Sequence, residues 1–151
     1  MLTPLLQADE VCVLPDGHPL LAKRLLKPKD FADLPFVSFA PADPYRLLVD
    51  EMFEKQGVRR RLALETASAA SVCALVRQGL GVAIVNPLTA MELAGAGLQV
   101  RPLSVSIPFA VTLVVPQLRP ASPLREAFVK CLKQAASTLQ ASLRDLSRRP
   151  R

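Results

Sequence analysis

The order of sequence patterns predicts an α/β fold with a mostly parallel sheet. Short apolar segments rich in β-branched residues alternate with segments whose apolar residues recur at helical spacing, and only short loops separate them. Half of the 151 residues are hydrophobic, which is enough for one domain with a real core. Because strand–helix–strand units pair their strands in parallel through right-handed crossovers, we expect a doubly wound sheet.

The first predicted strand is the apolar run 11–14. It stops at Pro15-Asp16-Gly17, a sequence typical of a tight turn. Residues 18–35 show no steady period and are expected to be irregular, with one helical turn near 28–31. The next strand is predicted at 36–39, where the residues are again almost all apolar.

A helix is predicted directly after that strand. Asp43 can accept hydrogen bonds from the first amides of the helix, and Pro44 suits its first position because no N–H is needed there. Gly57 ends the helix. The apolar positions at helical spacing are Leu47, Leu48, Met52 and Phe53. A strand at 61–65 follows.

The next part of the chain repeats this plan. Ser68 opens a helix that Gly79 ends, and its apolar face contains Val72, Cys73, Leu75 and Val76. Residues 82–85 are all apolar, as is typical of a buried parallel strand. Asn86-Pro87 opens a third helix, and a short strand at 98–100 follows it.

The last two predicted elements are a strand at 109–115 and a long helix that opens at Ser122-Pro123. The helix carries a continuous apolar stripe, formed by Leu124, Phe128, Cys131, Leu132, Ala135, Leu139, Leu143 and Leu146. A stripe of this length is expected to need an apolar partner.

Composition argues against several classes of protein. Cys12, Cys73 and Cys131 lie far apart in apolar surroundings, and His18 is the single histidine, so we expect buried reduced thiols rather than a disulfide framework or a metal site. The net charge of +6 would suit binding to nucleic acid, but the basic residues form only one short run, 59–61, and a C-terminal tail with arginines at 148, 149 and 151. No aromatic side chains interleave with them, so we do not expect this chain to bind nucleic acid directly. No apolar run reaches about 18 residues and no signal peptide is visible, so a cytoplasmic protein without a membrane span is expected.

Three junctions between a strand and a helix are expected to form a ligand-binding edge. Asp43, Ser68 and Asn86 each stand where a strand ends and a helix begins, and the carboxyl ends of parallel strands lie along one edge of a sheet. Helix N-termini carry unpaired amides and partial positive charge, which suits a carboxylate. The alternative is that each side chain caps only its own helix.

Arg46 and Tyr45 add to this expected site. A guanidinium can hold a carboxylate through two hydrogen bonds, and Tyr45 is the single tyrosine of the chain. The alternative is that Arg46 pairs with Asp43 or Asp50 on the surface, where an ion pair contributes little.

Motifs of enzymes are missing. Residues 79–81 (GLG) follow a helix and precede a strand, which is the reverse of the order in a dinucleotide-binding turn. Nothing in the sequence would activate a Cys12–His18 nucleophilic pair. We therefore expect no enzyme activity and no cofactor.

Two longer runs carry a family resemblance. The segments 10–20 (EVCVLPDGHPL) and 74–85 (ALVRQGLGVAIV) resemble the LysR-type transcription regulators, and the similarity covers nearly all of 5–135. The resemblance implies a periplasmic-binding-protein-like (type II) effector domain of two subdomains with the effector between them. Within the family, the runs 65–73 and 85–90 are most similar to the member that controls diaminopimelate decarboxylase. That similarity implies regulation of lysine biosynthesis, with diaminopimelate or lysine as the effector.

The resemblance also implies how the chain is divided. Residues 1–14 are expected to be a remnant of regulatory subdomain I with the crossing strand, 15–108 a complete subdomain II, and 109–151 the returning strand and C-terminal helix of subdomain I. The N-terminal DNA-binding domain is expected to be absent, so DNA contacts and the homo-oligomer belong to the parent protein. The fragment is expected to lack the usual dimer contact and to associate, if at all, through the helix at 123–146.

The effector contacts implied by the resemblance fall on the same junctions. They comprise Asp43, Tyr45, Arg46, Glu65, Thr66, Ser68 and Asn86. We expect Arg46 or the helix end at Ser68 to hold a ligand carboxylate, and Asp43 or Glu65 to hold an ammonium group. The alternative function is a solute-binding protein of an amino-acid transporter, which shares the fold.

Overall fold

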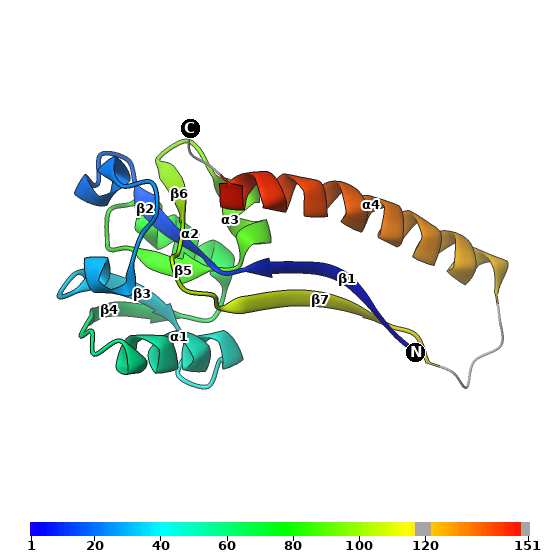
Figure 1. Cartoon of the computed structure of the whole chain (residues 1–151), viewed down its shortest axis with the longest axis horizontal. Helices are drawn as coiled ribbons and strands as arrows, with labels where there is room; N and C mark the ends of the chain where they lie inside the picture. The colour runs from blue at the N-terminus through cyan, green and yellow to red at the C-terminus, as the bar shows by residue number, and fades with distance from the viewer. Residues whose placement is uncertain (117–121, 149–151) are drawn as a thin grey trace.

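A computed structural model describes residues 1–116 and 122–148 of the chain (Figure 1). The strands are β1 (Leu2–Asp9), β2 (Val11–Pro15), β3 (Pro35–Phe39), β4 (Arg61–Thr66), β5 (Ala83–Val85), β6 (Leu98–Pro102) and β7 (Pro108–Val114). The helices are α1 (Pro44–Lys55), α2 (Ala69–Arg77), α3 (Pro87–Leu93) and α4 (Pro123–Arg148). Two short 3-10 helices, η1 (Pro19–Ala22) and η2 (Pro28–Phe31), lie in the segment expected to be irregular.

The central sheet has the strand order β6-β2-β5-β3-β4. β2 pairs antiparallel with both β5 and β6, and β3 pairs in parallel with β4. A parallel bridge between Phe36 and Val82 joins the two ladders, with Val37 N donating to Val82 O at 2.9 Å. Four strands of this sheet therefore run in one direction, which confirms the mostly parallel sheet, and β2 runs against them.

The hydrophobic core lies on both faces of this sheet. Side chains of a strand alternate between its two faces, so Val11 and Val13 of β2 join the core under α2 and α3, while Cys12 and Leu14 join the core under α1. In the second core, the rings of Phe31, Phe36 and Phe53 meet edge to face, with centroids 5.7 to 6.1 Å apart. Helices thus cover both faces, as a doubly wound fold requires.

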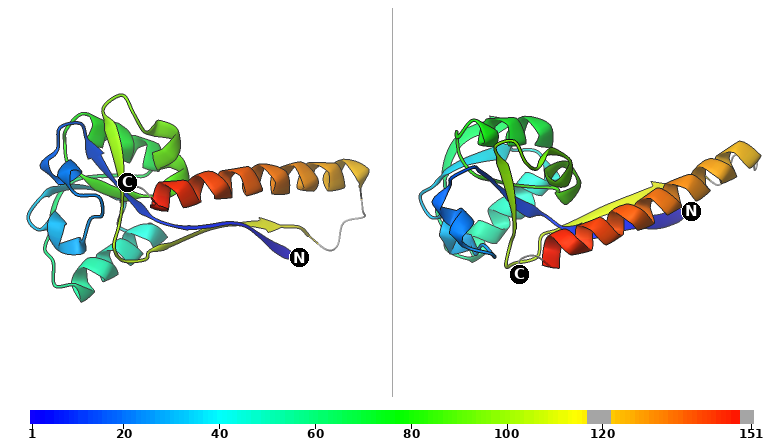
Figure 2. Two further views of the ribbon diagram at one scale, coloured as in Figure 1. Left: turned by 45° about the horizontal axis from the view of Figure 1, so that its top comes forward. Right: turned by 90° about the horizontal axis from the view of Figure 1, so that it is seen from above.

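A second part of the molecule extends away from this unit, and we call β1, β7 and α4 the arm (Figures 1 and 2). β1 and β7 pair antiparallel, and α4 packs along β1, burying Leu6, Ala136 and Leu143. The Gln140 side chain donates to Gln7 O and accepts from Gln7 N, both at 2.9 Å, and so satisfies backbone groups of β1. The arm crosses to the sheet at Glu10, whose N–H donates to Ile107 O at 2.9 Å.

The structure departs from three sequence-based expectations. β1 was not predicted, because Pro4 interrupts its pattern at a register shift and Leu6 is its single buried residue. Leu47 and Leu48 of α1 are 57% and 39% exposed, because the helix faces the core with Arg46, Val49 and the two other predicted positions, Met52 and Phe53. Cys131 is exposed rather than buried, because it lies on the uncovered side of α4.

The apolar stripe of α4 is only partly covered. Leu143 is buried against the arm, whereas Leu124, Phe128 and Leu139 are 81%, 61% and 38% exposed. The stripe therefore keeps an uncovered apolar surface. Within the described residues, no helix has the length and hydropathy needed to cross a membrane.

Candidate functional site

One edge of the central sheet collects the residues that the sequence predicts for a site. The carboxyl ends of β3, β4 and β5 lie there, and each is followed by the N-terminus of a helix. Figure 1 shows that α1 begins beside the start of β7, so this edge faces the arm. The ring of Tyr45 lies against the ring of Phe109 in β7, with centroids 6.0 Å apart. The edge is therefore the place where the unit and the arm meet.

All three predicted caps form in the structure. Asp43 Oδ1 accepts from Tyr45 N at 2.8 Å and from Arg46 N at 3.2 Å. Ser68 Oγ accepts from Ser71 N at 3.1 Å, and Asn86 Oδ1 accepts from Thr89 N at 2.9 Å. These oxygens satisfy amides that an α-helix leaves unpaired at its start.

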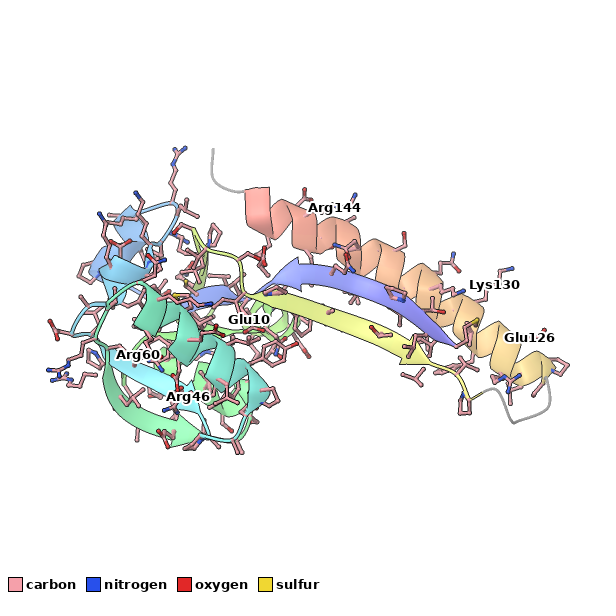
Figure 3. All side chains as sticks on the ribbon, turned by 60° about the horizontal axis from the view of Figure 1, so that its bottom comes forward. Glu10, Arg46, Arg60, Glu126, Lys130 and Arg144 are labelled. Carbon is pink, nitrogen blue, oxygen red and sulfur yellow. The ribbon has the colours of Figure 1, made fainter. Side chains whose placement is uncertain are left out.

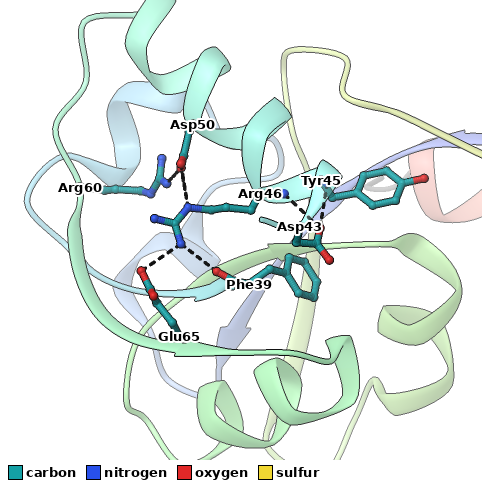
Figure 4. Close-up of polar contacts among 7 residues, drawn as sticks. All are labelled: Phe39, Asp43, Tyr45, Arg46, Asp50, Arg60 and Glu65. Carbon is teal, nitrogen blue, oxygen red and sulfur yellow. Dashed lines mark hydrogen bonds and ion pairs between the residues drawn. The ribbon is translucent and has the colours of Figure 1, made fainter. Parts of the chain in front are cut away.

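Arg46 is buried in a network of ion pairs (Figure 4), which includes the pair with Asp50 that the sequence analysis gave as the alternative. Its Nε donates to both oxygens of Asp50, at 2.9 and 2.7 Å. Its Nη1 donates to Phe39 O at 2.7 Å and to Glu65 Oε1 at 3.0 Å. The predicted carboxylate holder and one predicted ammonium holder, Glu65, are thus paired with each other.

Arg60 completes this network from the other side of Asp50. It forms an ion pair with Asp50, and its guanidinium lies 4.8 Å from the ring centre of Phe36 and 4.6 Å from that of Phe53. A guanidinium stacked on aromatic faces and paired with a carboxylate is stabilised by both contacts. The network links α1 to the end of β3 and to β4.

Thr66 has a backbone role at the same edge. Its carbonyl accepts from Ala40 N at 3.1 Å, which fixes the loop that leads to α1. The amides of Ala69 and Ala70 precede the first internal bond of α2, from Val72 N to Ser68 O, and have no acceptor in the described part of the chain. An anion could be bound by such amides.

Glu10 is a site residue that sequence reasoning missed. Register places it at the same edge, one residue before Val11, which pairs with Val85 immediately before Asn86. Its residue is 1% exposed, and neither carboxylate oxygen has a hydrogen-bond partner among the described residues. Burial, followed by the nearby charge of Asp43, raises the pKa of Glu10 to about 8. The sequence signal was an acidic pair, Asp9-Glu10, directly before a fully apolar strand.

Cys12 and His18 are not arranged for nucleophilic catalysis, and the described residues form no metal site. Burial, followed by the charge of Asp30, raises the pKa of the Cys12 thiol, so it is not an activated nucleophile. His18 Nδ1 accepts from Leu20 N at 3.2 Å, and burial lowers the pKa of the imidazole. Across residues 1–116 and 122–146, no group of three or more His, Cys, Asp or Glu side chains is placed to hold a metal ion.

Comparison with known proteins adds a family match. The family model described as LysR substrate binding domain matches residues 2–137. The chain is 49% identical to the transcriptional activator protein LysR of Escherichia coli over 141 residues, and 29% identical to the regulatory protein NocR of Agrobacterium tumefaciens over 129 residues. These alignments cover 93% and 85% of this chain but only 45% and 43% of the relatives. The chain therefore spans less than half the length of either protein.

Solved structures give the same fold. The regulatory domain of Synechocystis CcmR, in complex with 2-PG, matches with a TM-score of 0.74 and 19% identity over 90% of this chain and 66% of that one. The effector binding domain of QuiR, in complex with shikimate, matches with a TM-score of 0.70 and 19% identity over 91% of this chain and 66% of that one. At this identity the likeness concerns the fold alone.

Proposed function

The chain belongs to the family of LysR substrate-binding domains, whose members are transcription regulators and not enzymes, and we propose that it senses a diamino acid for a regulator of lysine biosynthesis. The proposed effector is diaminopimelate or lysine. The observation that carries this proposal is the 49% identity to LysR of Escherichia coli over 93% of the chain. The reported relatives are regulators, so the transporter alternative has no support.

The geometry supports a small-molecule site at the edge of the sheet that faces the arm. We propose that the start of α2, with Ser68 and the amides of Ala69 and Ala70, takes the ligand carboxylate. Asp43 is the proposed ammonium contact, while Tyr45, Thr66 and Asn86 line the same edge. Arg46 and Glu65 are reassigned to holding α1 in place, because their charged groups are paired with each other.

We propose the following division of the parent protein. Residues 15–108 form regulatory subdomain II, and the segments 1–14 and 109–151 supply part of subdomain I. Contacts with DNA and with further copies of the regulator belong to the parent protein, since the chain covers 45% of its E. coli relative. The uncovered stripe on α4 supports this division, because an apolar helix face is stabilised by a covering layer.

Titration calorimetry tests the proposed effector. We expect meso-diaminopimelate or L-lysine to bind, and shikimate, the ligand of QuiR, not to bind. Ser68→Ala should weaken diaminopimelate about 5- to 20-fold, because it removes the cap that fixes the start of α2. Ser137→Ala, an exposed position on α4, is the matched control and should bind as the wild type does. Equal affinity for all three compounds would contradict the proposal.

A further inference from the structure

Glu10 is a buried carboxyl group without a counter-ion among the residues that the structure describes. It stands where the chain passes from β1 into β2, between the arm and the central sheet (Figure 3). Its backbone is fixed by the bond from Glu10 N to Ile107 O at 2.9 Å, but its two carboxylate oxygens have no partner in the described part of the chain. A buried acceptor without a donor lowers the stability of the folded chain, which suggests that the carboxyl group of Glu10 has a function at this position.

The surrounding charges make an ammonium the natural partner of Glu10. Asp43, at the start of α1, adds a negative charge that helps to raise the pKa of Glu10. Burial, followed by the charge of Glu10, raises the pKa of Tyr45, so the two side chains lie near each other. The nearest basic side chain on α1, Arg46, is already bound by Asp50 and Glu65. Val11, the residue after Glu10, pairs with Val85, and the residue that follows Val85 is the uncharged Asn86. Among the described residues, the edge therefore has two acidic groups, and no cation is among the causes that shift the pKa of Glu10.

We propose that Glu10 binds the ammonium group of an amino-acid effector, with Asp43 as its second carboxylate. This subsite rests on the proposed function and assigns a residue to it. The Oδ1 atom of Asp43 accepts both helix amides, which leaves Oδ2 for the ligand. An ammonium group has three donors, and the two oxygens of Glu10 and Oδ2 of Asp43 offer three acceptors.

The positions of these groups along the edge also predict how the ligand is oriented when it binds. The unpaired amides of Ala69 and Ala70 lie at the start of α2, and the two carboxylates lie at the starts of β2 and α1. A zwitterionic ligand would place its carboxylate at α2 and its ammonium at Glu10. A dicarboxylate without an amine would lose the second contact, so the subsite selects amino acids over their deaminated analogues.

Proton release provides a sharp test. Because the pKa of Glu10 is about 8, the free side chain is mostly protonated at pH 7, and an ammonium ligand would require the carboxylate. Calorimetry with meso-diaminopimelate in phosphate and in Tris at pH 7 should show about 0.9 proton released per ligand. Pimelate, which lacks the amines, should release none and should bind more weakly.

Glu10→Gln separates the subsite from the rest of the site. The amide has the same shape but cannot ionise, so proton release should disappear and the affinity for meso-diaminopimelate should fall about 10- to 100-fold. Glu54→Gln, an exposed position on α1, is the control and should behave as the wild type does. Circular dichroism establishes that both variants fold, and the wild-type proton count needs no variant.

The outcomes are distinguishable. If wild-type protein binds neither meso-diaminopimelate nor L-lysine, the proposed function fails and the subsite fails with it. If the wild type binds meso-diaminopimelate without releasing a proton, or if Glu10→Gln binds it equally well, the subsite alone is overturned. If proton release is present in the wild type and absent in Glu10→Gln, the subsite is supported.

Discussion

The buried carboxyl of Glu10 should make the folded chain less stable as the pH rises. Its pKa is about 8 in the folded state and about 4.5 when the chain is unfolded. Between these values the folded state binds a proton that the unfolded state has lost, so the free energy of unfolding falls by about 1.4 kcal/mol per pH unit. Below pH 4.5 both states are protonated and the effect is absent. The full loss by about pH 8 is roughly 4 to 5 kcal/mol.

Urea unfolding, followed by circular dichroism at pH 5, 6.5 and 8, measures this loss. Glu10→Gln should remove most of the decline, so that the variant is more stable than the wild type at pH 8. Glu54→Gln should follow the wild-type curve. His18 titrates in the same range, but its lowered pKa favours the folded state at higher pH and is common to all three proteins. Parallel pH profiles for wild type and Glu10→Gln would refute the reasoning.

Three further changes test other features of the structure. Gly81→Ala should destabilise the chain by about 1 to 3 kcal/mol in urea, because Gly81 has a φ of 157° and a Cβ there would lie 2.7 Å from Pro35 O; unchanged stability would count against this close approach. Arg60→Ala should lower the free energy of unfolding, measured by thermal unfolding, by about 2 to 4 kcal/mol, because it removes the stacked cation and one partner of Asp50. Arg59→Ala, at an exposed position, is the control and should change the stability little. Phe128→Asp should shift any self-association seen by light scattering toward monomer, because Phe128 is 61% exposed on the apolar side of α4; an unaffected dimer would place the contact elsewhere.

Most of the central sheet could be predicted from the sequence, because its elements have strong local signals. The run 82–85 is wholly apolar, and the caps Asp43, Ser68 and Asn86 stand at the junctions where the structure forms them. These features depend on residues close together in the chain. The arm is different, because β1 owes its strand conformation to pairing with β7, more than 90 residues away. A partner that distant leaves little trace in the local pattern.

The candidate site shows the same division. Its location at the sheet edge follows from the positions of the helix caps, which sequence reasoning found. The state of each charged group does not, because it depends on tertiary neighbours. Arg46 is paired with Glu65, 19 residues away, and the backbone of buried Glu10 donates to Ile107, which lies far along the chain. Sequence reasoning offered Asp50 as an alternative partner of Arg46, and the structure contains that pair, but it did not find the pairing with Glu65 and it overlooked Glu10.

The double crossing between the arm and the central unit has a mechanical consequence. The chain passes between them at Glu10 and again after Ile107, and one hydrogen bond ties these two points together. If the two points act as a pivot, the long helix sets the reach of the movement, because the 26 residues of α4 span about 39 Å. A rotation of roughly 10° at the pivot would carry the far end of the helix through about 7 Å. A small displacement that a ligand causes at Glu10 would therefore become a much larger displacement at the far end of α4.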